Sequence, residues 1–161
     1  MRGCRGCQPY SLPPCNHHVS GDLPNCSHPF SPTPECVKEC SPGYHNTYEK
    51  DKHFGVLEYR VLGETSIMRE LYYHGPVTAT FTVYSDFPSY KSGVYTHRHG
   101  PSLGGHAVKL LGWGTENGLD YWLAANSWNT NWGDQGFFKI AKGRNECGFE
   151  SYIVTGLPLE T

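Results

Sequence analysis

The sequence has no long apolar run and no excess of either charge. Its 13 Lys and Arg residues nearly balance 15 Asp and Glu residues, which gives a formal net charge of −2. No apolar stretch approaches the roughly 20 residues of a membrane-spanning helix. This composition offers no electrostatic basis for binding nucleic acid or an anionic membrane, so we expect neither partner.

The first residues also lack the apolar core of a signal peptide, because Met1 to Cys7 contain no apolar run. The chain as written therefore shows no route into the secretory pathway. Its seven cysteines nevertheless suit an exported protein. Truncation would resolve this conflict, and we expect the chain to be truncated.

Six of the seven cysteines fall between Cys4 and Cys40, among Pro, Gly and Asn residues. This density predicts a disulfide framework in an exported protein or a zinc site in a cytosolic one. Zinc could take ligands from three groups: Cys4-x-x-Cys7, Cys15 with His17 and His18, and Cys36-x3-Cys40. The second half of a regular CxxC…CxxC pattern is absent, so we prefer disulfides and expect no metal and no cofactor.

The length of 161 residues fits one domain with a moderate core. The composition changes near residue 50, where a part rich in Pro, Cys and Gly gives way to alternating apolar and polar residues. We therefore divide the chain into a disulfide-rich loop segment, residues 1–50, and a β-rich domain, residues 51–161.

Apolar periodicity in the second part predicts an α+β fold that is mostly β. One helix is expected over residues 66–74, with Thr65 or Ser66 as its N-cap and Gly75-Pro76 after its end. A single turn is expected at residues 86–90. Strands are expected at residues 56–62, 77–83, 107–111, 121–125, 136–141 and 151–155. Several short strands separated by turns favour an antiparallel barrel or a curled sheet.

The stretch from Gly104 to Gly136 holds all four tryptophans, a histidine directly after two glycines, and an asparagine 20 positions later. The turn signal Thr-Glu-Asn-Gly at residues 115–118 separates its two apolar runs. If the runs pair as antiparallel strands, His106 lies opposite Asn126. The side-chain amide is then within reach of the imidazole.

That pairing has a chemical use. A neutral asparagine oxygen can accept the imidazole N–H and fix the ring without adding charge, which suits a histidine beside a thiolate. Gly104 and Gly105 have no Cβ and permit close approach of a substrate backbone. A lone histidine at a strand end is usually structural, but Gly-Gly-His-Ala, Asn-Ser-Trp and Trp-Gly-Asp-Gln-Gly-Phe-Phe occur here together and in order.

These motifs resemble the His and Asn segments of the papain family of cysteine peptidases, through GGHA and NSWNTNWGDQGFFKI. Three further stretches resemble its cathepsin B-like branch: PYSLPPCNHH, ECGFES and YSDFPSYKSGVY. The resemblance runs from about Gly6 to the C-terminus. It implies the antiparallel, barrel-like right domain of the papain fold, with the helical left domain missing.

The resemblance also implies site roles. His106 would be the imidazole partner of the nucleophile, and Asn126 its orienting residue. Trp128 would shield their hydrogen bond, and Trp132 would form a wall on the leaving-group side. The face that carries these residues would meet the missing domain, so we expect an exposed apolar patch there.

A substrate pocket follows from the same resemblance. Ala107 and a residue within 146–152 would border the pocket for the second residue before the cleaved bond. Tyr152 stands where cathepsin B often has a glutamate that accepts arginine. We therefore expect an apolar or aromatic preference at this subsite, although Tyr152 is also suited to a structural role in a strand.

The nucleophile itself is missing. The family carries its cysteine in a C-G-[SA]-C-[WY] signature about 130–150 residues before the histidine. Only 105 residues precede His106, and Trp or Tyr follows none of the seven cysteines. The glutamine of the oxyanion hole is also absent. We expect both groups to lie before Met1 and the chain alone to be inactive.

The resemblance pairs Cys7 with Cys40 and Cys15 with Cys26. In the family, the position of Cys36 would bridge to a cysteine of the N-terminal half, so in this chain Cys36 would be an orphan or would pair with Cys4. Cys147 would remain a buried thiol. An odd number of cysteines agrees with at least one missing partner.

The loop from Cys15 to Cys26 resembles the occluding loop of cathepsin B. Its His17 and His18 would receive the C-terminal carboxylate of a peptide, which gives dipeptidyl carboxypeptidase activity. Leu23 and Asn131 stand where an arginine and its aspartate partner are usual. We expect a less firmly held loop and relatively more endopeptidase activity.

Two functions follow. The chain is the C-terminal portion of a cathepsin B-like cysteine peptidase, or it is a non-catalytic module that binds peptides or proteins. The resemblance implies peptide or protein substrates, an N-terminal half as partner, and a cystatin-type inhibitor. It also implies a lysosomal or secreted location.

Overall fold

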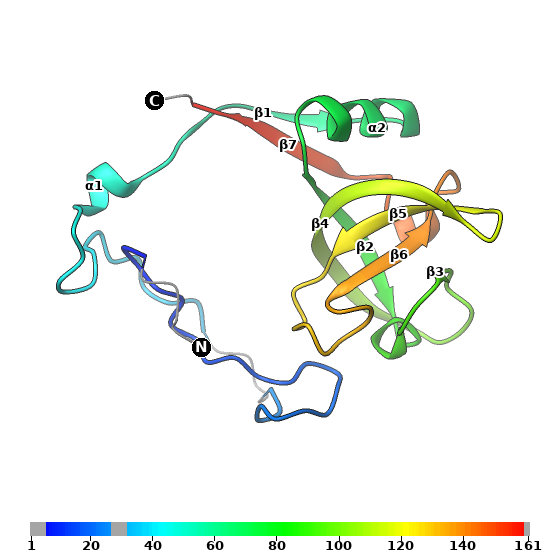
Figure 1. Cartoon of the computed structure of the whole chain (residues 1–161), viewed down its shortest axis with the longest axis horizontal. Coiled ribbons are helices and arrows are strands. Elements are labelled where there is room, and N and C mark those ends of the chain that lie inside the picture. The colour runs from blue at the N-terminus through cyan, green and yellow to red at the C-terminus, as the bar shows by residue number, and fades with distance from the viewer. Residues whose placement is uncertain (1–5, 27–31, 160–161) are drawn as a thin grey trace.

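A computed structural model describes residues 6–26 and 32–159, so Cys4 and its expected pairing lie outside the described residues. The described part is mostly β and is built around one curled sheet, with strand order β1-β7-β2-β4-β5-β6-β3 (Figure 1). The strands are β1 (Gly55–Val61), β2 (Val77–Tyr84), β3 (Val94–Tyr95), β4 (Ser102–Glu116), β5 (Leu119–Ala125), β6 (Phe137–Ala141) and β7 (Ile153–Pro158). The helices are α1 (Tyr48–Asp51), α2 (Glu64–Tyr73) and the 3₁₀ turns Phe87–Ser89 and Glu146–Gly148. The α+β, mostly β prediction is confirmed.

The β4–β5 hairpin is longer than the apolar runs suggested. β4 extends over 15 residues, and only Asn117 and Gly118 remain in the turn. Both have positive φ, 51° and 77°, as a two-residue type I′ turn requires. A bulge between Leu110 and Gly112 shifts the register, so Lys109 pairs with Ala125. β4 therefore continues past the end of β5, and at His106 it pairs with β2 alone.

The core lies on the concave side of the curled sheet. Alternate residues of β2, namely Ala79, Phe81 and Val83, point inward and are buried. They meet aromatic and aliphatic side chains from β5, β6 and the loops, including Trp122, Phe138, Ile140, Phe87 and Phe149. Complete burial of each large side chain stabilises the fold by roughly 1.5–3 kcal/mol.

Helix α2 begins earlier than predicted. Its N-cap is Gly63, which has φ of +84°, and neither Thr65 nor Ser66 caps it. The Ile67 N–H donates to the Gly63 carbonyl, which sets the first turn. This start places Ile67 and Leu71 against the core, because residues four apart share one face. The cap prediction was wrong by about half a turn.

Two further elements differ from the sequence prediction. The short helix α1 was not predicted; it starts where the Thr47 hydroxyl accepts the Lys50 N–H. The two-residue strand β3 pairs with β6 in parallel, whereas the other pairs of strands in the described sheet are antiparallel. Both elements are too short for a periodic signal.

The β1–β7 ribbon reaches away from the curled sheet (Figure 1). Its exposed residues include Val56 and Leu57, and the adjoining helix α2 exposes Tyr72 and Tyr73. The ribbon and α2 therefore carry part of the exposed apolar surface of the described residues.

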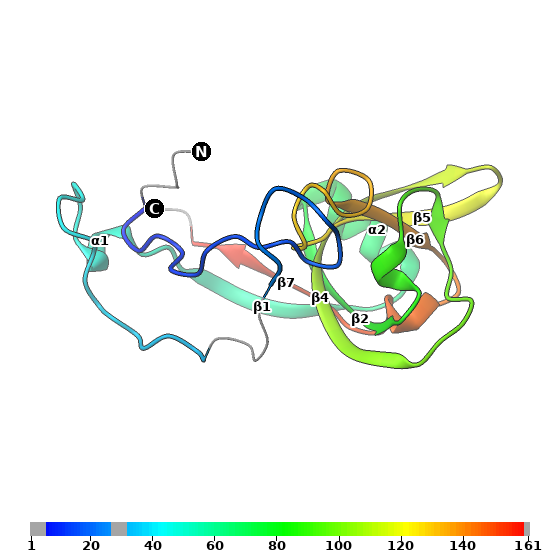
Figure 2. The same ribbon diagram turned by 90° about the horizontal axis from the view of Figure 1, so that it is seen from below.

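The N-terminal segment has little regular structure and lies along one side of the ribbon and sheet (Figure 2). The Cys7–Cys40 and Cys15–Cys26 disulfides close its loops, with the pairing that the resemblance implied. The loop at residues 15–26 lies beside the loop after β5, where the Asn129 amide donates to the Cys15 carbonyl.

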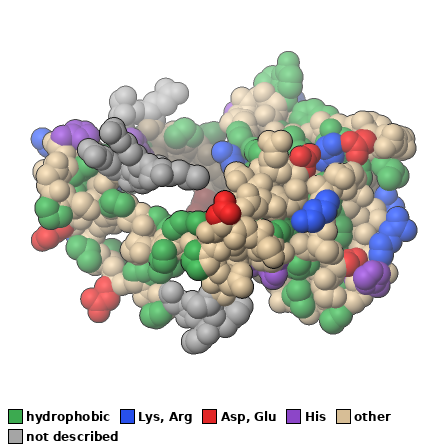
Figure 3. All heavy atoms as spheres, turned by 60° about the horizontal axis from the view of Figure 1, so that its bottom comes forward, with side chains coloured by type: hydrophobic (Ala, Val, Ile, Leu, Met, Phe, Trp, Pro, Cys, Tyr) green, Lys and Arg blue, Asp and Glu red, His purple; other side chains and the backbone are tan. Residues whose placement is uncertain are grey.

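The surface carries charges of both signs. Acidic and basic side chains are spread over the face shown in Figure 3. Among the described residues, no helix has the length and hydrophobicity needed to cross a membrane.

Candidate active site

His106 and Asn126 form the centre of the candidate site. His106 lies on the part of β4 that extends beyond β5, and Asn126 directly follows the last residue of β5. Because Lys109 is the partner of Ala125, the two residues are diagonal neighbours and not directly opposite, as the sequence suggested. Their side chains nevertheless meet, and Nε2 of His106 lies 2.8 Å from Oδ1 of Asn126.

A second contact fixes the protonation pattern of this pair. The Ser127 backbone N–H also points at Asn126 Oδ1, at 2.8 Å. A backbone N–H can only donate, so the Asn126 atom in this position must be the oxygen. His106 Nε2 must then carry a proton to donate to the same oxygen. In neutral His106, Nδ1 therefore keeps its lone pair and is available as a base.

Trp128 covers this hydrogen-bonded pair. Its ring stacks on the His106 imidazole, with centroids 5.2 Å apart and planes inclined by 25°. The Trp128 side chain is only 7% exposed, so it shields the pair from water. A hydrogen bond shielded in this way is stronger than one in open solvent.

Neither Trp128 nor Trp132 contributes to the exposed apolar patch that was expected on this face. Trp132 is completely buried, its Nε1 donates to the Pro88 carbonyl at 2.9 Å, and its ring packs against Phe87 and Tyr90. The prediction that Trp132 forms a wall beside the substrate is therefore not met in this structure. The packing of both tryptophans against Phe87, a residue of the 3₁₀ turn after β2, explains the difference.

A hollow of about 550 Å³ opens next to Asn126, on the side away from the core. It lies between the start of β2, the middle of β4 and the end of β5. Its lining includes Thr78, Ala107, Lys109, Asn126 and Ser127. The outer face of the sheet is thus recessed beside the candidate catalytic pair.

The residues expected around the substrate pocket lie on this outer face. Thr80 on β2 is the register partner of Ala107 on β4, and its N–H donates to the Tyr152 carbonyl at 3.2 Å. Tyr152 is 46% exposed, and Gly105 has open space where a Cβ would stand. A row of residues therefore crosses β4, β2 and the segment before β7. It consists of Ala107, which directly follows His106, then Thr80 and Tyr152.

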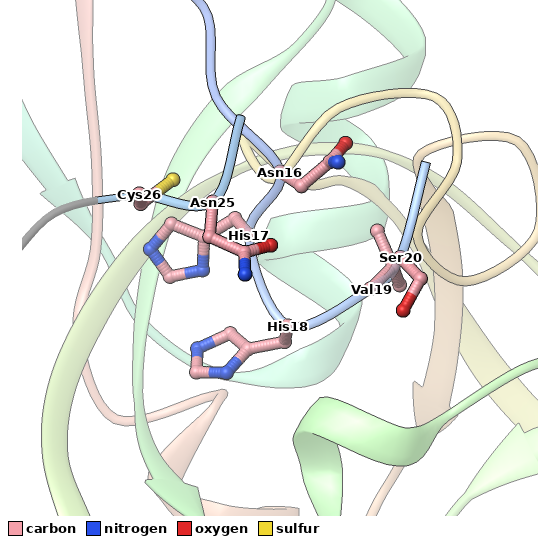
Figure 4. A pocket seen from close by; sticks show the side chains of 7 residues that line it. All are labelled: Asn16, His17, His18, Val19, Ser20, Asn25 and Cys26. Carbon is pink, nitrogen blue, oxygen red and sulfur yellow. The ribbon is translucent and has the colours of Figure 1, made fainter. Parts of the chain in front are cut away.

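The two loop histidines approach the same tryptophan. The His17 ring stacks on Trp128 with centroids 5.1 Å apart and planes inclined by 8°, and the His18 ring lies 4.7 Å from Trp128. The two imidazoles are 4.3 Å apart, and they lie on the same side of the loop, whereas Asn16 points away (Figure 4). A hollow of about 380 Å³ adjoins them. The structure therefore brings His17, His18 and His106 around one indole ring.

Close packing holds this loop against the residues after β5. A Cβ on Gly21 would lie 2.8 Å from Asn131 Nδ2 and 2.9 Å from Asn16 Oδ1. Asn16 is buried, and its amide donates to the Leu23 carbonyl. The Leu23 carbonyl and the Asn131 side chain thus lie in this packing, at the two positions where the cathepsin B-like branch usually has an arginine and its aspartate partner.

The cysteines divide into two groups. Cys7, Cys15, Cys26 and Cys40 are in disulfides, so these four sulfurs are not thiolate ligands for zinc. Among the described residues the free thiols are Cys36, which is exposed, and Cys147, which is partly buried. Burial and the nearby carboxylates of Glu146 and Asp86 raise the pKa of Cys147 to about 12.

Two carboxylates that the sequence did not reveal hold the loops around the site. Asp86 accepts hydrogen bonds from the Tyr95 hydroxyl and from the backbone N–H groups of Arg98 and His99, in the segment that leads to β4. Glu150 accepts from the buried Trp122 indole at 2.8 Å, just before Tyr152. A single Asp or Glu carries no periodic signal, so these roles depend on contacts distant in sequence.

A family model described as papain family cysteine protease matches residues 2–157. A cathepsin B-like cysteine proteinase of Schistosoma japonicum is 48% identical over 153 residues, which cover 94% of this chain and 45% of that protein. A gut-specific cysteine proteinase of Caenorhabditis elegans is 55% identical over 152 residues, which cover 94% of this chain and 44% of that protein. The chain thus spans about half the length of the curated relatives it matches.

The solved structures include a similar chain. Procathepsin B S9 from Trypanosoma congolense superposes with a TM-score of 0.81 at 40% identity, over 96% of this chain and 48% of that one. The similarity therefore extends over almost the whole sequence and includes the N-terminal loop segment.

Proposed function

Because the chain belongs to the papain family of cysteine proteases, we propose that it forms the C-terminal part of a cathepsin B-like enzyme that hydrolyses peptide bonds. The observation that carries this proposal is the 2.8 Å hydrogen bond between His106 and Asn126, with the Ser127 N–H fixing the direction of the amide. It leaves an imidazole nitrogen free on a histidine whose orientation is already set.

The proposed mechanism uses His106 Nδ1 as base and then as acid. A cysteine supplied by an N-terminal half gives its thiol proton to Nδ1, and the thiolate attacks the peptide carbonyl carbon. The imidazolium protonates the leaving amine, which leaves a thioester. His106 then takes a proton from water, and the resulting hydroxide attacks the thioester carbonyl carbon. The carbon–sulfur bond breaks, and the imidazolium returns its proton to the sulfur, which leaves the acid and the free thiol.

Asn126 and Trp128 support this cycle without reacting. The Asn126 oxygen stabilises the imidazolium through the Nε2–H and prevents the ring from turning. Trp128 excludes water from that hydrogen bond. A neutral orienting residue adds no negative charge, so the imidazolium remains free to stabilise the neighbouring thiolate.

The outer sheet face is the proposed substrate side. Gly105 permits close approach of a peptide backbone, and Ala107 with Tyr152 borders the pocket for the second residue before the cleaved bond. The tyrosine ring offers apolar area to an aromatic or aliphatic side chain. We infer that such side chains are preferred there.

The loop at residues 15–26 is the proposed exopeptidase element. His17 and His18, gathered at Trp128, would receive the C-terminal carboxylate of a peptide and direct the release of dipeptides. No ion pair joins positions 23 and 131, so we infer that the loop opens more readily and that internal cleavage also occurs.

The same reasoning gives a location and partners. Disulfides persist in oxidising compartments, which supports a lysosomal or secreted enzyme. Peptide or protein substrates and the N-terminal half are the partners that the chemistry requires, and a cystatin-type inhibitor is the expected regulator.

The proposal is tested by joining this chain to the N-terminal half of the Caenorhabditis elegans relative and measuring cleavage of a fluorogenic peptide. The joined enzyme should cleave the peptide, and the chain by itself should not. A joined enzyme that folds and binds the peptide without cleaving it would support the alternative, a non-catalytic peptide-binding module.

A further inference from the structure

Arg60 on β1 is stacked on the ring of Tyr152. Its guanidinium carbon lies 4.5 Å from the ring centroid, and Nη2 donates to the Ser151 carbonyl at 3.2 Å. The flat guanidinium group favours this stacking on an aromatic face, which leaves most of its N–H groups free at the edge. Arg60 thus has a defined position at the proposed substrate pocket.

The strand register places Arg60 on the substrate side of the sheet. Val61 and Ile153 are register partners and are both buried, so Arg60, Tyr152 and Val154 point to the opposite, outer face. The neighbouring residue Tyr59 points to the helix side, where its hydroxyl donates to Glu70.

A row of residues on this face carries a second positive charge. Arg60 pairs with Val154, Val154 with Thr78, and Thr78 with Lys109. Lys109 also lines the hollow beside Asn126. Among the described residues, no ion pair joins Arg60 or Lys109 to a carboxylate. Neither positive charge is therefore engaged in an ion pair within this part of the chain.

The distances suit a side chain of the substrate. An extended peptide rises about 3.3 Å per residue, so the second residue before the cleaved bond lies roughly 7 Å from the reacting carbonyl. Neighbouring strands are about 4.8 Å apart, which puts the segment of Tyr152 roughly 10 Å from β4. A long side chain at that substrate position, if it lies across Thr80, reaches the Tyr152 ring and the exposed N–H groups of the Arg60 guanidinium.

We propose that Arg60, held on Tyr152, selects the charge of the second residue before the cleaved bond, accepting Glu and Asp and rejecting Arg and Lys. This inference rests on the proposed function and on the place of Tyr152 in it. A carboxylate can take two N–H groups from the guanidinium edge, whereas a basic side chain meets two positive charges. Aromatic residues remain good substrates, because they need only the ring of Tyr152.

The test uses the joined enzyme and three fluorogenic peptides that differ only at this position, with Phe, Glu or Arg. Activity is normalised to the cysteine titrated with a peptide epoxide. We expect kcat/KM for Glu to exceed that for Arg by about tenfold or more in the wild type. Arg60→Ala should reduce this ratio about tenfold and leave Phe within about twofold.

Two further variants and one control sharpen the test. Arg60→Met removes the charge and keeps the packing of the side chain, so it should behave like Arg60→Ala. Arg60→Lys keeps the positive charge but loses the flat stacking, so it should retain part of the preference for Glu over Arg. Arg98→Ala removes another exposed arginine, in the segment before β4, where the backbone N–H contacts Asp86, and it should change nothing.

The outcomes separate the two proposals. In the first outcome, cleavage of the Phe peptide depends on His106, but Arg60→Ala and Arg60→Met change the ratio of kcat/KM for Glu to that for Arg by less than twofold. This result overturns the role of Arg60 and leaves the proposed peptidase function intact. Absence of His106-dependent cleavage of all three peptides overturns the proposed function and this inference with it.

Discussion

The side-chain oxygen of Asn126 lies 2.8 Å from Nε2 of His106, and the same oxygen accepts the neighbouring Ser127 N–H. The pair is thus set before any substrate arrives, because a backbone donor fixes the amide and the amide fixes the ring. Preorganisation of this kind removes the cost of orienting the base during the reaction.

Asn126→Ala in the joined enzyme should lower kcat/KM by roughly 10- to 100-fold. This is less than the ~10⁴-fold drop seen when a charged orienting residue is replaced in a serine protease triad, because asparagine supplies position without charge. Peptide hydrolysis measures the effect, and Asn46→Ala near α1 is the control. A variant within twofold of the wild type would show that Asn126 does not orient His106.

Asp86 should make stability depend on acid pH. Burial raises its pKa, but hydrogen bonds from the Arg98 N–H, the Tyr95 hydroxyl, His97 and the His99 N–H outweigh burial and hold the pKa well below its usual value. A carboxyl with a lowered pKa contributes stability above its unfolded pKa of about 3.9 and loses it as pH falls toward the folded value.

Asp86→Asn should therefore cost about 1–3 kcal/mol at neutral pH. It should also remove the part of the acid destabilisation that Asp86 contributes below about pH 4. Urea denaturation at several pH values measures both effects, with the exposed Asp22→Asn as control. An Asp86→Asn curve parallel to that of the wild type down to pH 3 would contradict this account.

Gly21→Ala should loosen the loop at residues 15–26. The added Cβ would come within 3 Å of both the Asn16 oxygen and the Asn131 nitrogen. Asn16 is buried and held by the Leu23 carbonyl, so the loop must shift. In the joined enzyme, dipeptide release should fall severalfold relative to internal cleavage. Gly6→Ala, where nothing lies within 4 Å, is the control, and an equal change in both variants would argue against the loop's role.

Cys147 should react slowly with alkylating reagents at pH 8. Burial and neighbouring carboxylates raise its pKa to about 12, so little reactive thiolate is present. Exposed Cys36 should be modified first. Mass spectrometry after brief iodoacetamide treatment gives the order, and raising the pH should accelerate Cys147. Equal rates at pH 8 would show that Cys147 is less shielded than the structure indicates.

The elements with clear periodicity could be predicted from sequence. Strand β2 alternates apolar and polar residues throughout, and it was placed within one residue at its C-terminal end. The contact between His106 and Asn126 followed from a hairpin with an Asn-Gly turn. Its diagonal geometry did not follow, because a bulge at Leu110 leaves no mark in an apolar run.

Contacts between distant segments could not be predicted. The burial of Trp132 depends on Phe87, a residue of an irregular turn some 45 positions earlier in the chain. The stacking of Arg60 on Tyr152 depends on the pairing of β1 with β7, which brings together residues from nearly opposite ends of the domain. Composition and spacing contain no signal for either contact.

We expect His106 to activate a cysteine of the N-terminal half. The most direct measurement of this activation is the rate at which that cysteine in the joined enzyme is alkylated by a peptide epoxide, since this reaction requires thiolate formation but no turnover. His106→Ala should slow alkylation by at least about 100-fold, while His53→Ala, an exposed histidine in the same domain, should leave it unchanged. Alkylation of the His106→Ala enzyme at the wild-type rate would contradict the account.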